Sequence, residues 1–174
     1  MKILKSILVV SLAVMISTAV TANFVIAGED QNLATVRKLV DAFNHKNVAM
    51  YDDIYSSKLT YYGTGENAKM NLDGLKQFMS GIFAAFPNGK LTLDDLFAKG
   101  NEVVYRVTFT GTQTGDMPGS PGIPATGKMV TASSIGIVRF ESGKIVQEWE
   151  NFDDLGMMQQ LGVIPMSEAG QQSK

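Results

Sequence analysis

Apolar residues in the first half of the chain recur at helical spacing. The clearest series has intervals of three and four: Leu33, Val36, Leu39, Val40 and Phe43. This spacing predicts a helix over residues 31–45 with one apolar face, and a shorter helical segment is expected over 48–55. Asn71 is placed to cap a third helix, which the turn residues at 87–89 would end. The first half is therefore mainly helical.

The second half changes to a period of two, which is typical of strands. Four segments alternate in this way: 90–98, 102–111, 130–140 and 144–152. A further strand is expected over 58–62, and residues 141–143 would form a tight turn that pairs the last two strands antiparallel. Helices followed by long strands predict an α+β domain, with the helices packed on one face of a curved antiparallel sheet. The interior of such a sheet is concave.

The alternation in the last strand assigns its residues to two faces. One face carries Ile145, Gln147, Trp149, Asn151 and Asp153. The other carries Val146, Glu148, Glu150, Phe152 and Asp154. Two glutamates mark the second face as solvated, so we expect the first face to point toward the helices. That orientation would bring an amide and a carboxylate into an apolar interior.

Asp153 is the candidate acid/base residue on this face. Burial beside Trp149 would raise the pKa of its carboxyl group, which could then exchange a proton near neutral pH. The competing interpretation is structural, because Asp153 or Asp154 is also placed to cap a short helix over 155–161 that Gly162 ends. The pattern favours capping, and the pair could divide the two roles.

The amino terminus has the pattern of a signal peptide. Two lysines precede an apolar run over residues 7–20, and small residues at cleavage spacing end at Ala22 and Ala27. We expect a leader over residues 1–27 and a periplasmic or secreted protein, with no membrane contact after cleavage. An uncleaved membrane anchor is the alternative.

Composition limits the partners of the remaining domain, residues 28–174. The net charge of the whole chain is −2, and loss of the two leader lysines leaves −4, which does not attract nucleic acid. The chain has no cysteine, and His45 is its only histidine. A zinc or iron site therefore lacks ligands, and we expect neither a metal nor a cofactor.

The end of the chain resembles a known family. Residues 143–162 (GKIVQEWENFDDLGMMQQLG) are similar to the closing signature of the SnoaL-like polyketide cyclase and ester cyclase group, and 83–87, 103–115 and 126–128 agree in order and spacing. The resemblance implies the cone-shaped fold of nuclear transport factor 2 and ketosteroid isomerase. Cones of this kind host cyclases, isomerases, dehydratases and binding proteins, so the signature does not define a reaction.

The resemblance also implies roles for particular residues. In cyclases of this family an aspartate near the end of the last strand is the acid/base of an intramolecular aldol ring closure, and Asp153 matches it. Gln113 stands where relatives usually carry histidine; it could donate a hydrogen bond to an enolate but cannot shuttle a proton. The loop over 116–125 is longer than in relatives, and forms either a rim over the cavity mouth or an ordinary surface connection.

These considerations give two functional hypotheses. The first is a cofactor-free cyclase or isomerase acting on a hydrophobic carbonyl compound, and the second is an exported binding protein for a small apolar molecule. The expected ligand contacts are Trp149, Gln113, Tyr62, Phe86, Asn151 and Arg106, although Arg106 could equally lie on the outer face of its strand. Relatives often pair through the convex face of the sheet, so we expect a homodimer.

Overall fold

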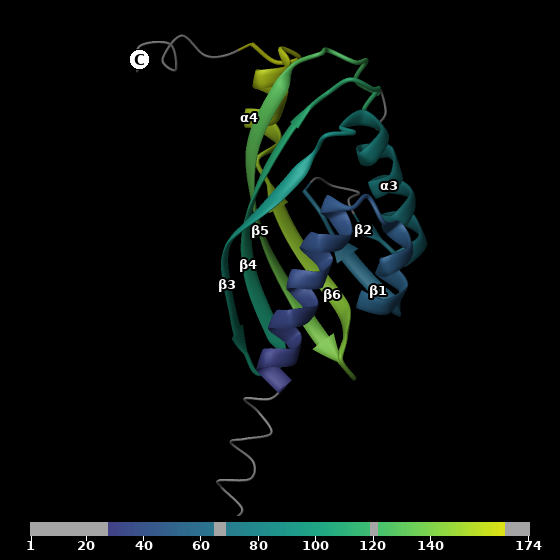
Figure 1. Cartoon of the computed structure of the whole chain (residues 1–174), viewed down its shortest axis with the longest axis vertical. Coiled ribbons are helices and arrows are strands. Elements are labelled where there is room, and N and C mark those ends of the chain that lie inside the picture. The colour runs from purple at the N-terminus through teal and green to yellow at the C-terminus, as the bar shows by residue number, and fades with distance from the viewer. Residues whose placement is uncertain (1–27, 65–68, 119–121, 166–174) are drawn as a thin grey trace, which may run out of the picture.

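The sheet has six strands in the order β2-β1-β6-β5-β4-β3. Their bounds are β1 (Tyr55–Tyr62), β2 (Lys69–Met70), β3 (Lys90–Lys99), β4 (Glu102–Thr112), β5 (Met129–Glu141) and β6 (Lys144–Phe152). The computed structural model describes residues 28–64, 69–118 and 122–165, so the predicted leader lies outside the described residues. Figure 1 shows that the long strands curve together and leave a concave side.

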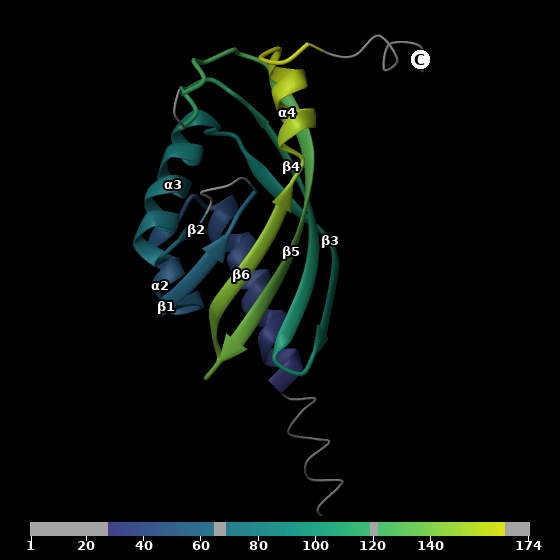
Figure 2. The same ribbon diagram turned by 180° about the vertical axis from the view of Figure 1, so that it is seen from behind.

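The helices cover this concave side. The first runs over residues 28–44, and the others are η1 (Val48–Met50), α2 (Tyr51–Ile54), α3 (Leu72–Ala85) and α4 (Asp154–Leu161). Figures 1 and 2 together place the first helix and α3 on the concave side, with α4 at one end of the sheet. In the described ranges, no helix is long and apolar enough to cross a membrane. The architecture is the α+β arrangement expected from the sequence.

Most of the predicted elements are confirmed. The Asn71 side chain caps α3 by accepting a hydrogen bond from the Gly74 N–H at 2.9 Å. One expectation is wrong, because β1 pairs parallel to β6 and the sheet is mixed rather than antiparallel. After β1 the chain passes through α3 and the meander β3–β5, and returns beside β1 in the same direction. Periodicity identifies strands but not their neighbours, so it could not show this pair.

A β-bulge in β6 changes which residues face the interior. Arg139 of β5 pairs with Gln147 and Phe140 pairs with Ile145, so Val146 has no partner residue in β5. An extra residue in one strand interrupts its alternation. Ile145 faces inward as predicted, but beyond the bulge the buried residue is Glu148, with 2% of its surface exposed. The predicted orientation of residues 147–153 is therefore wrong.

Aromatic side chains pack where the first helix and the end of α3 meet the sheet. Phe109 of β4 lies edge to face with Phe86 and with Phe43, with ring centroids 5.2 and 6.1 Å apart. Such contacts add roughly 0.5–1.5 kcal/mol each to the burial of the rings. They fix the end of α3 and the first helix against the sheet without any disulfide.

Candidate active site

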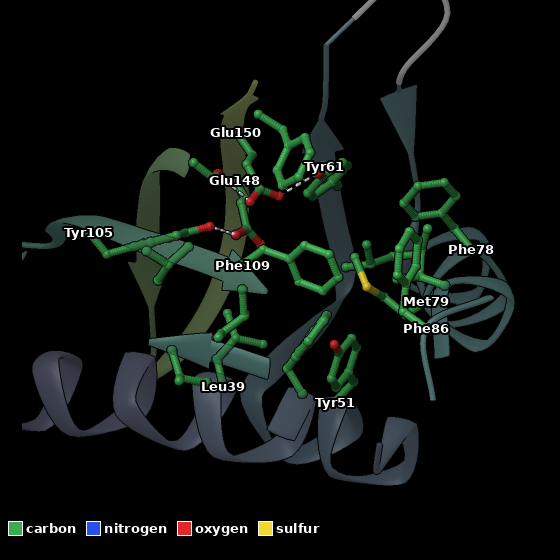
Figure 3. Close-up of a pocket in the computed structure, with 18 of the residues that line it drawn as sticks. Leu39, Tyr51, Tyr61, Phe78, Met79, Phe86, Tyr105, Phe109, Glu148 and Glu150 are labelled. Carbon is green, nitrogen blue, oxygen red and sulfur yellow. Dashed lines mark hydrogen bonds between the residues drawn. The ribbon is translucent and has the colours of Figure 1, made fainter. Parts of the chain in front are cut away.

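A cavity of about 180 Å³ lies between the concave face of the sheet, the first helix and α3. Most of its wall is apolar, and aromatic rings are its main component: Phe43, Tyr51, Phe78, Phe86, Phe109 and Phe152. Figure 3 shows Phe78, Met79 and Phe86 on one side of the cavity and two carboxylates on the other. A concave apolar site with a few convergent polar groups is the usual form of a small-molecule site.

Glu148 is the more deeply buried of the two carboxylates. It lies on the inner face of β6, and both of its oxygens accept hydrogen bonds from tyrosine hydroxyls. The Tyr55 hydroxyl donates to Oε2 at 2.7 Å, and the Tyr105 hydroxyl donates to Oε1 at 2.5 Å. A carboxyl group held by two donors is fixed in position, as proton transfer requires.

Glu150 is the second carboxylate, two residues further along the same face. Its Oε2 accepts a hydrogen bond from the Tyr61 hydroxyl at 2.7 Å, and its Oε1 accepts one from the Ser134 hydroxyl at 2.6 Å. Figure 3 shows Glu148, Glu150, Tyr61 and Tyr105 converging on one end of the cavity. All four carboxyl oxygens therefore have a hydroxyl partner.

Burial changes the acidity of this cluster. The pKa of Glu148 is raised to about 7, first by desolvation and then by the negative charge of Glu150, while the hydroxyls of Tyr105 and Tyr55 oppose the rise. Desolvation also raises the pKa of the Tyr55, Tyr61 and Tyr105 hydroxyls far above the ordinary value. The tyrosines thus remain hydrogen-bond donors, while Glu148 can gain or lose a proton near neutral pH.

Gly136 makes the contact between Tyr105 and Glu148 possible. Tyr105 lies on β4 and Glu150 on β6, and both pair with Gly136 of the intervening strand β5. A Cβ atom on Gly136 would lie 2.1 Å from the Tyr105 ring, a distance that real atoms do not reach. The missing side chain leaves the space through which Tyr105 crosses β5 and reaches the carboxylate.

The structure assigns Asp153 to the cap of α4. Its side chain is exposed and accepts a hydrogen bond from the Gly156 N–H at 2.9 Å, and Gly162 ends the helix in the left-handed conformation. Asp154 begins α4 and accepts a hydrogen bond from Thr64. The capping interpretation is confirmed. The predicted burial of Asp153 beside Trp149 is wrong, because both lie outside the cavity lining.

Three other predicted ligand contacts lie away from the cavity. Trp149 stacks on Tyr62 on the outer face, with ring centroids 5.5 Å apart and an angle of 4° between the rings. The Arg139 guanidinium lies 5.2 Å from the Trp149 ring on the same face. Asn151 is exposed. The bulge at Val146 accounts for the positions of Trp149 and Asn151, because it directs these β6 side chains outward. Tyr62 of β1 lies beside Trp149 on the same outer face.

Gln113 and Arg106 have structural partners instead of a ligand. The fully buried Gln113 amide donates to the carbonyls of Ile123 and Pro124 and accepts two hydrogen bonds from Thr126, so it holds the loop against the end of β4. Arg106 is on the outer face of its strand, where it forms ion pairs with Asp94 and Asp95.

The remaining wall comes from Phe86 and from the long loop. Phe86 lines the cavity as predicted, with 2% of its surface exposed. Met117 and Pro118 also line it, and Met117 pairs with Ile123 in an isolated β-bridge. The described part of the 116–125 loop is thus a wall of the cavity rather than an ordinary surface connection.

Sequence reasoning missed the glutamates and their tyrosine partners. Glu148 and Glu150 share a face with Phe152, and this large apolar residue was a signal that the face is inward. The tyrosines at 55, 61 and 105 lie on different strands and come together only in the folded chain. Among the described residues, no three His, Cys, Asp or Glu side chains are grouped as metal ligands would be.

Comparison with known proteins gives the family. The model of the SnoaL-like polyketide cyclase family matches residues 34–161, which is most of the chain. This protein belongs to that family. A search of curated proteins gave no match. Membership supports a function of the cyclase or isomerase type.

Solved structures agree with the family in fold. A candidate SnoaL-like polyketide cyclase from Jannaschia sp. CCS1 is 20% identical, with a TM-score of 0.70, over 79% of this chain and 95% of its own. AclR from Streptomyces galilaeus, a candidate hydroxylase, is 24% identical, with a TM-score of 0.70, over 79% and 99%. TsrD from Streptomyces laurentii is 28% identical, with a TM-score of 0.65, over 75% and 97%. The descriptions differ, so the shared fold does not define one reaction.

Proposed function

We propose that this protein is a cyclase or isomerase that moves protons on an apolar carbonyl compound, with Glu150 as the base and Glu148 as the acid. One observation supports this most strongly: two carboxyl groups from one face of β6 enter an otherwise apolar, aromatic cavity. Glu148 is assigned the role of the acid, because desolvation raises the pKa of this carboxyl group and it can carry the proton near neutral pH; the neighbouring Glu150 is then the base. The proposal replaces Asp153 as the acid/base residue.

The proposed reaction begins with removal of a proton from the carbon next to the carbonyl group. Glu150 takes this proton, and the C–H electron pair moves into an enolate whose oxygen accepts a hydrogen bond or a proton from Glu148. In a cyclase, the enolate carbon then bonds to a second carbonyl carbon of the same molecule, and the resulting alkoxide takes the proton from Glu150. In an isomerase, the proton returns from Glu150 to a different carbon. In both routes, a proton that Glu148 has given to the enolate oxygen returns to Glu148 when the carbonyl group forms again. Both routes balance without a metal or an organic cofactor.

The surroundings of the pair suit this chemistry. The wall around the pair is mostly apolar and aromatic, and this low-dielectric surrounding strengthens the charge interactions of the buried Glu148. The four hydroxyl donors hold both carboxyl groups before the ligand enters, so little reorganisation is needed when charge develops. The cavity therefore has the two parts that enolate chemistry needs, a proton acceptor and a proton donor.

Exchange of α-protons tests the proposal without knowledge of the natural substrate. The methyl protons of acetophenone are followed by NMR in D₂O with the wild type, with Glu150→Gln and with Glu141→Gln. We expect the wild type to accelerate exchange, Glu150→Gln to lose the acceleration, and Glu141→Gln to keep it, because Glu141 is exposed at the end of β5. Binding of acetophenone without accelerated exchange would contradict catalysis and leave the binding-protein hypothesis.

Export and pairing remain proposals of their own. The sequence pattern supports cleavage after Ala27, and mass spectrometry of protein from the native host would give the mature amino terminus. The resemblance supports a homodimer, and the outer sheet face exposes Ile135 and Ile137, at 51% and 39%. Sedimentation velocity measures the assembly, and a single species of monomer mass would contradict the dimer.

A further inference from the structure

The volume of the cavity limits the size of the ligand. Pockets for drug-sized ligands have volumes of roughly 300–1,000 Å³, whereas an apolar cavity of roughly 150 Å³ is known to take benzene. At about 180 Å³, this cavity lies near the lower value. Rings fill much of the wall, and Phe109 is held between Phe43 and Phe86, so the wall cannot give way cheaply. A third fused ring would exceed this space and would have to displace wall residues or project from the cavity.

The charges of the cavity limit the ligand in a second way. Among the described residues that line it there is no lysine, arginine or histidine, while Glu148 and Glu150 are both present. An anionic ligand would lose its hydration and meet negative charge without a counterion. A cationic ligand would lose its hydration in the apolar cavity and would share oxygens that already accept hydroxyl hydrogens from three tyrosines and Ser134. The arrangement favours an uncharged ligand.

We infer that the cavity takes an uncharged carbonyl compound of one or two rings, or an open-chain precursor of the same volume. The inference rests on the proposed function, because a carbonyl oxygen facing Glu148 is what enolate chemistry needs. It also departs from the expectation of large polycyclic substrates that the word polyketide suggests. Size and charge can be tested separately from turnover.

A graded series of ketones tests the size limit. Acetophenone, 2-acetylnaphthalene and 2-acetylanthracene share the acetyl group and have one, two and three rings. We expect calorimetry to show binding of the first two, and at least tenfold weaker binding of the third. A Met79→Ala variant, which shortens a side chain of the wall and so enlarges the cavity, should recover binding of the three-ring ketone. Equal affinity of the wild type for the two- and three-ring ketones, or no binding of any of them, would overturn the inference.

A matched pair tests the charge limit. Acetophenone and benzoate have the same arrangement of non-hydrogen atoms and differ by one negative charge, and benzylammonium supplies the positive counterpart. We expect acetophenone to bind at least tenfold more tightly than either ion at pH 7. The preference over benzoate should shrink in Glu150→Gln and persist in Glu141→Gln. Tighter binding of either ion by the wild type would overturn the inference.

These measurements separate the two proposals. Tight, selective binding of acetophenone without α-proton exchange contradicts the catalytic function and leaves the ligand class intact. Exchange that proceeds equally well on charged or three-ring ketones contradicts the ligand class and leaves the function intact. Loss of both binding and exchange would overturn both.

Discussion

The two faces of β6 carry polar and aromatic residues in similar proportion and use them in opposite ways. On the outer face, Trp149 lies against Tyr62 and Arg139 at the solvent boundary. On the inner face, Glu148 and Glu150 lie among aromatic rings, and within the described ranges the partners of their oxygens are hydroxyl groups. Residue type alone would assign the tryptophan to the interior and the glutamates to solvent.

The difference shows that a buried carboxylate needs partners from other strands. Tyr55, Tyr61 and Tyr105 belong to β1 and β4, so the site exists only when both neighbours of the β5–β6 hairpin are in place. The outer stack is simpler, since Tyr62 lies beside Trp149 in the β1–β6 ladder. The inner face should therefore be far more sensitive to substitution than the outer face.

The largest expected effect is on catalysis at the inner face. Glu148→Gln and Glu150→Gln should each reduce acceleration of α-proton exchange by roughly 10²–10⁴-fold, because general acid/base groups contribute this much. The double variant should accelerate exchange nearly as much as the less active of the two single variants, since paired groups act as a unit. Asn151→Ala, on the outer face, should change the rate less than twofold. A comparable loss in Asn151→Ala would remove the contrast between the faces.

The next effect concerns stability and pH. The pKa of Glu148 is about 7 in the folded chain and near 4.5 in the unfolded chain, so the unfolded chain loses the proton first as the pH rises. The folded chain binds this proton more tightly, which stabilises it against unfolding. This stabilisation is present in full below pH 4.5 and is lost as the pH rises to about 7. It amounts to on the order of 3 kcal/mol. Urea unfolding at pH 4.5 and 8 should show this loss in the wild type, and a smaller one in Glu148→Gln.

Glu141→Gln serves as the control for the pH measurement because it removes an exposed carboxylate from the same hairpin. Its pH dependence should match that of the wild type. A Glu148→Gln variant whose stability follows the wild-type curve would show that Glu148 is ionised with the same ease in both states.

Gly136→Ala should have an intermediate effect. Its Cβ would collide with the Tyr105 ring, and overpacking of this kind typically costs 1–3 kcal/mol. Thermal or urea unfolding measures the cost. In a Tyr105→Leu background the same substitution should cost less than half as much, because the ring is gone. An equal loss of stability in both backgrounds would show that the missing side chain of Gly136 is not what makes room for the Tyr105 ring.

The smallest effect belongs to the outer face. Trp149→Ala removes the stack on Tyr62 and the contact with Arg139, which together contribute about 1–2 kcal/mol at a half-exposed site. Urea unfolding should show this loss, and α-proton exchange measured on the remaining folded protein should stay within twofold of the wild type. A large fall in exchange would mean that Trp149 supports the inner face after all.

Local signals in the sequence predicted most of the fold. Apolar spacing predicted the first helix, Asn71 predicted the start of α3, and the pair Asp153 and Gly162 marked both ends of α4. Each of these signals depends on a residue and its near neighbours in the chain. The parallel pairing of β1 with β6 depends on distant segments, and no local pattern encodes it.

The candidate site was less predictable for a related reason. A strict period of two assigns Glu148 to solvent, and only the register of β5 against β6 shows that Val146 is an extra residue. Phe86 was found because a large aromatic residue at the end of an amphipathic helix is buried in most arrangements. Gln113 was expected at the ligand because its sequence neighbours match the family, yet its amide is used entirely by the adjoining loop.

The bulge at Val146 has a consequence for transferring residue roles between relatives. A relative whose last strand lacks this extra residue needs a one-position gap here when the two chains are aligned. Without that gap, each residue on one side of Val146 is matched to a residue that points to the opposite face of the relative's sheet. An exposed helix cap can then be mistaken for the catalytic acid, while the carboxylates that face the cavity are taken for surface charge.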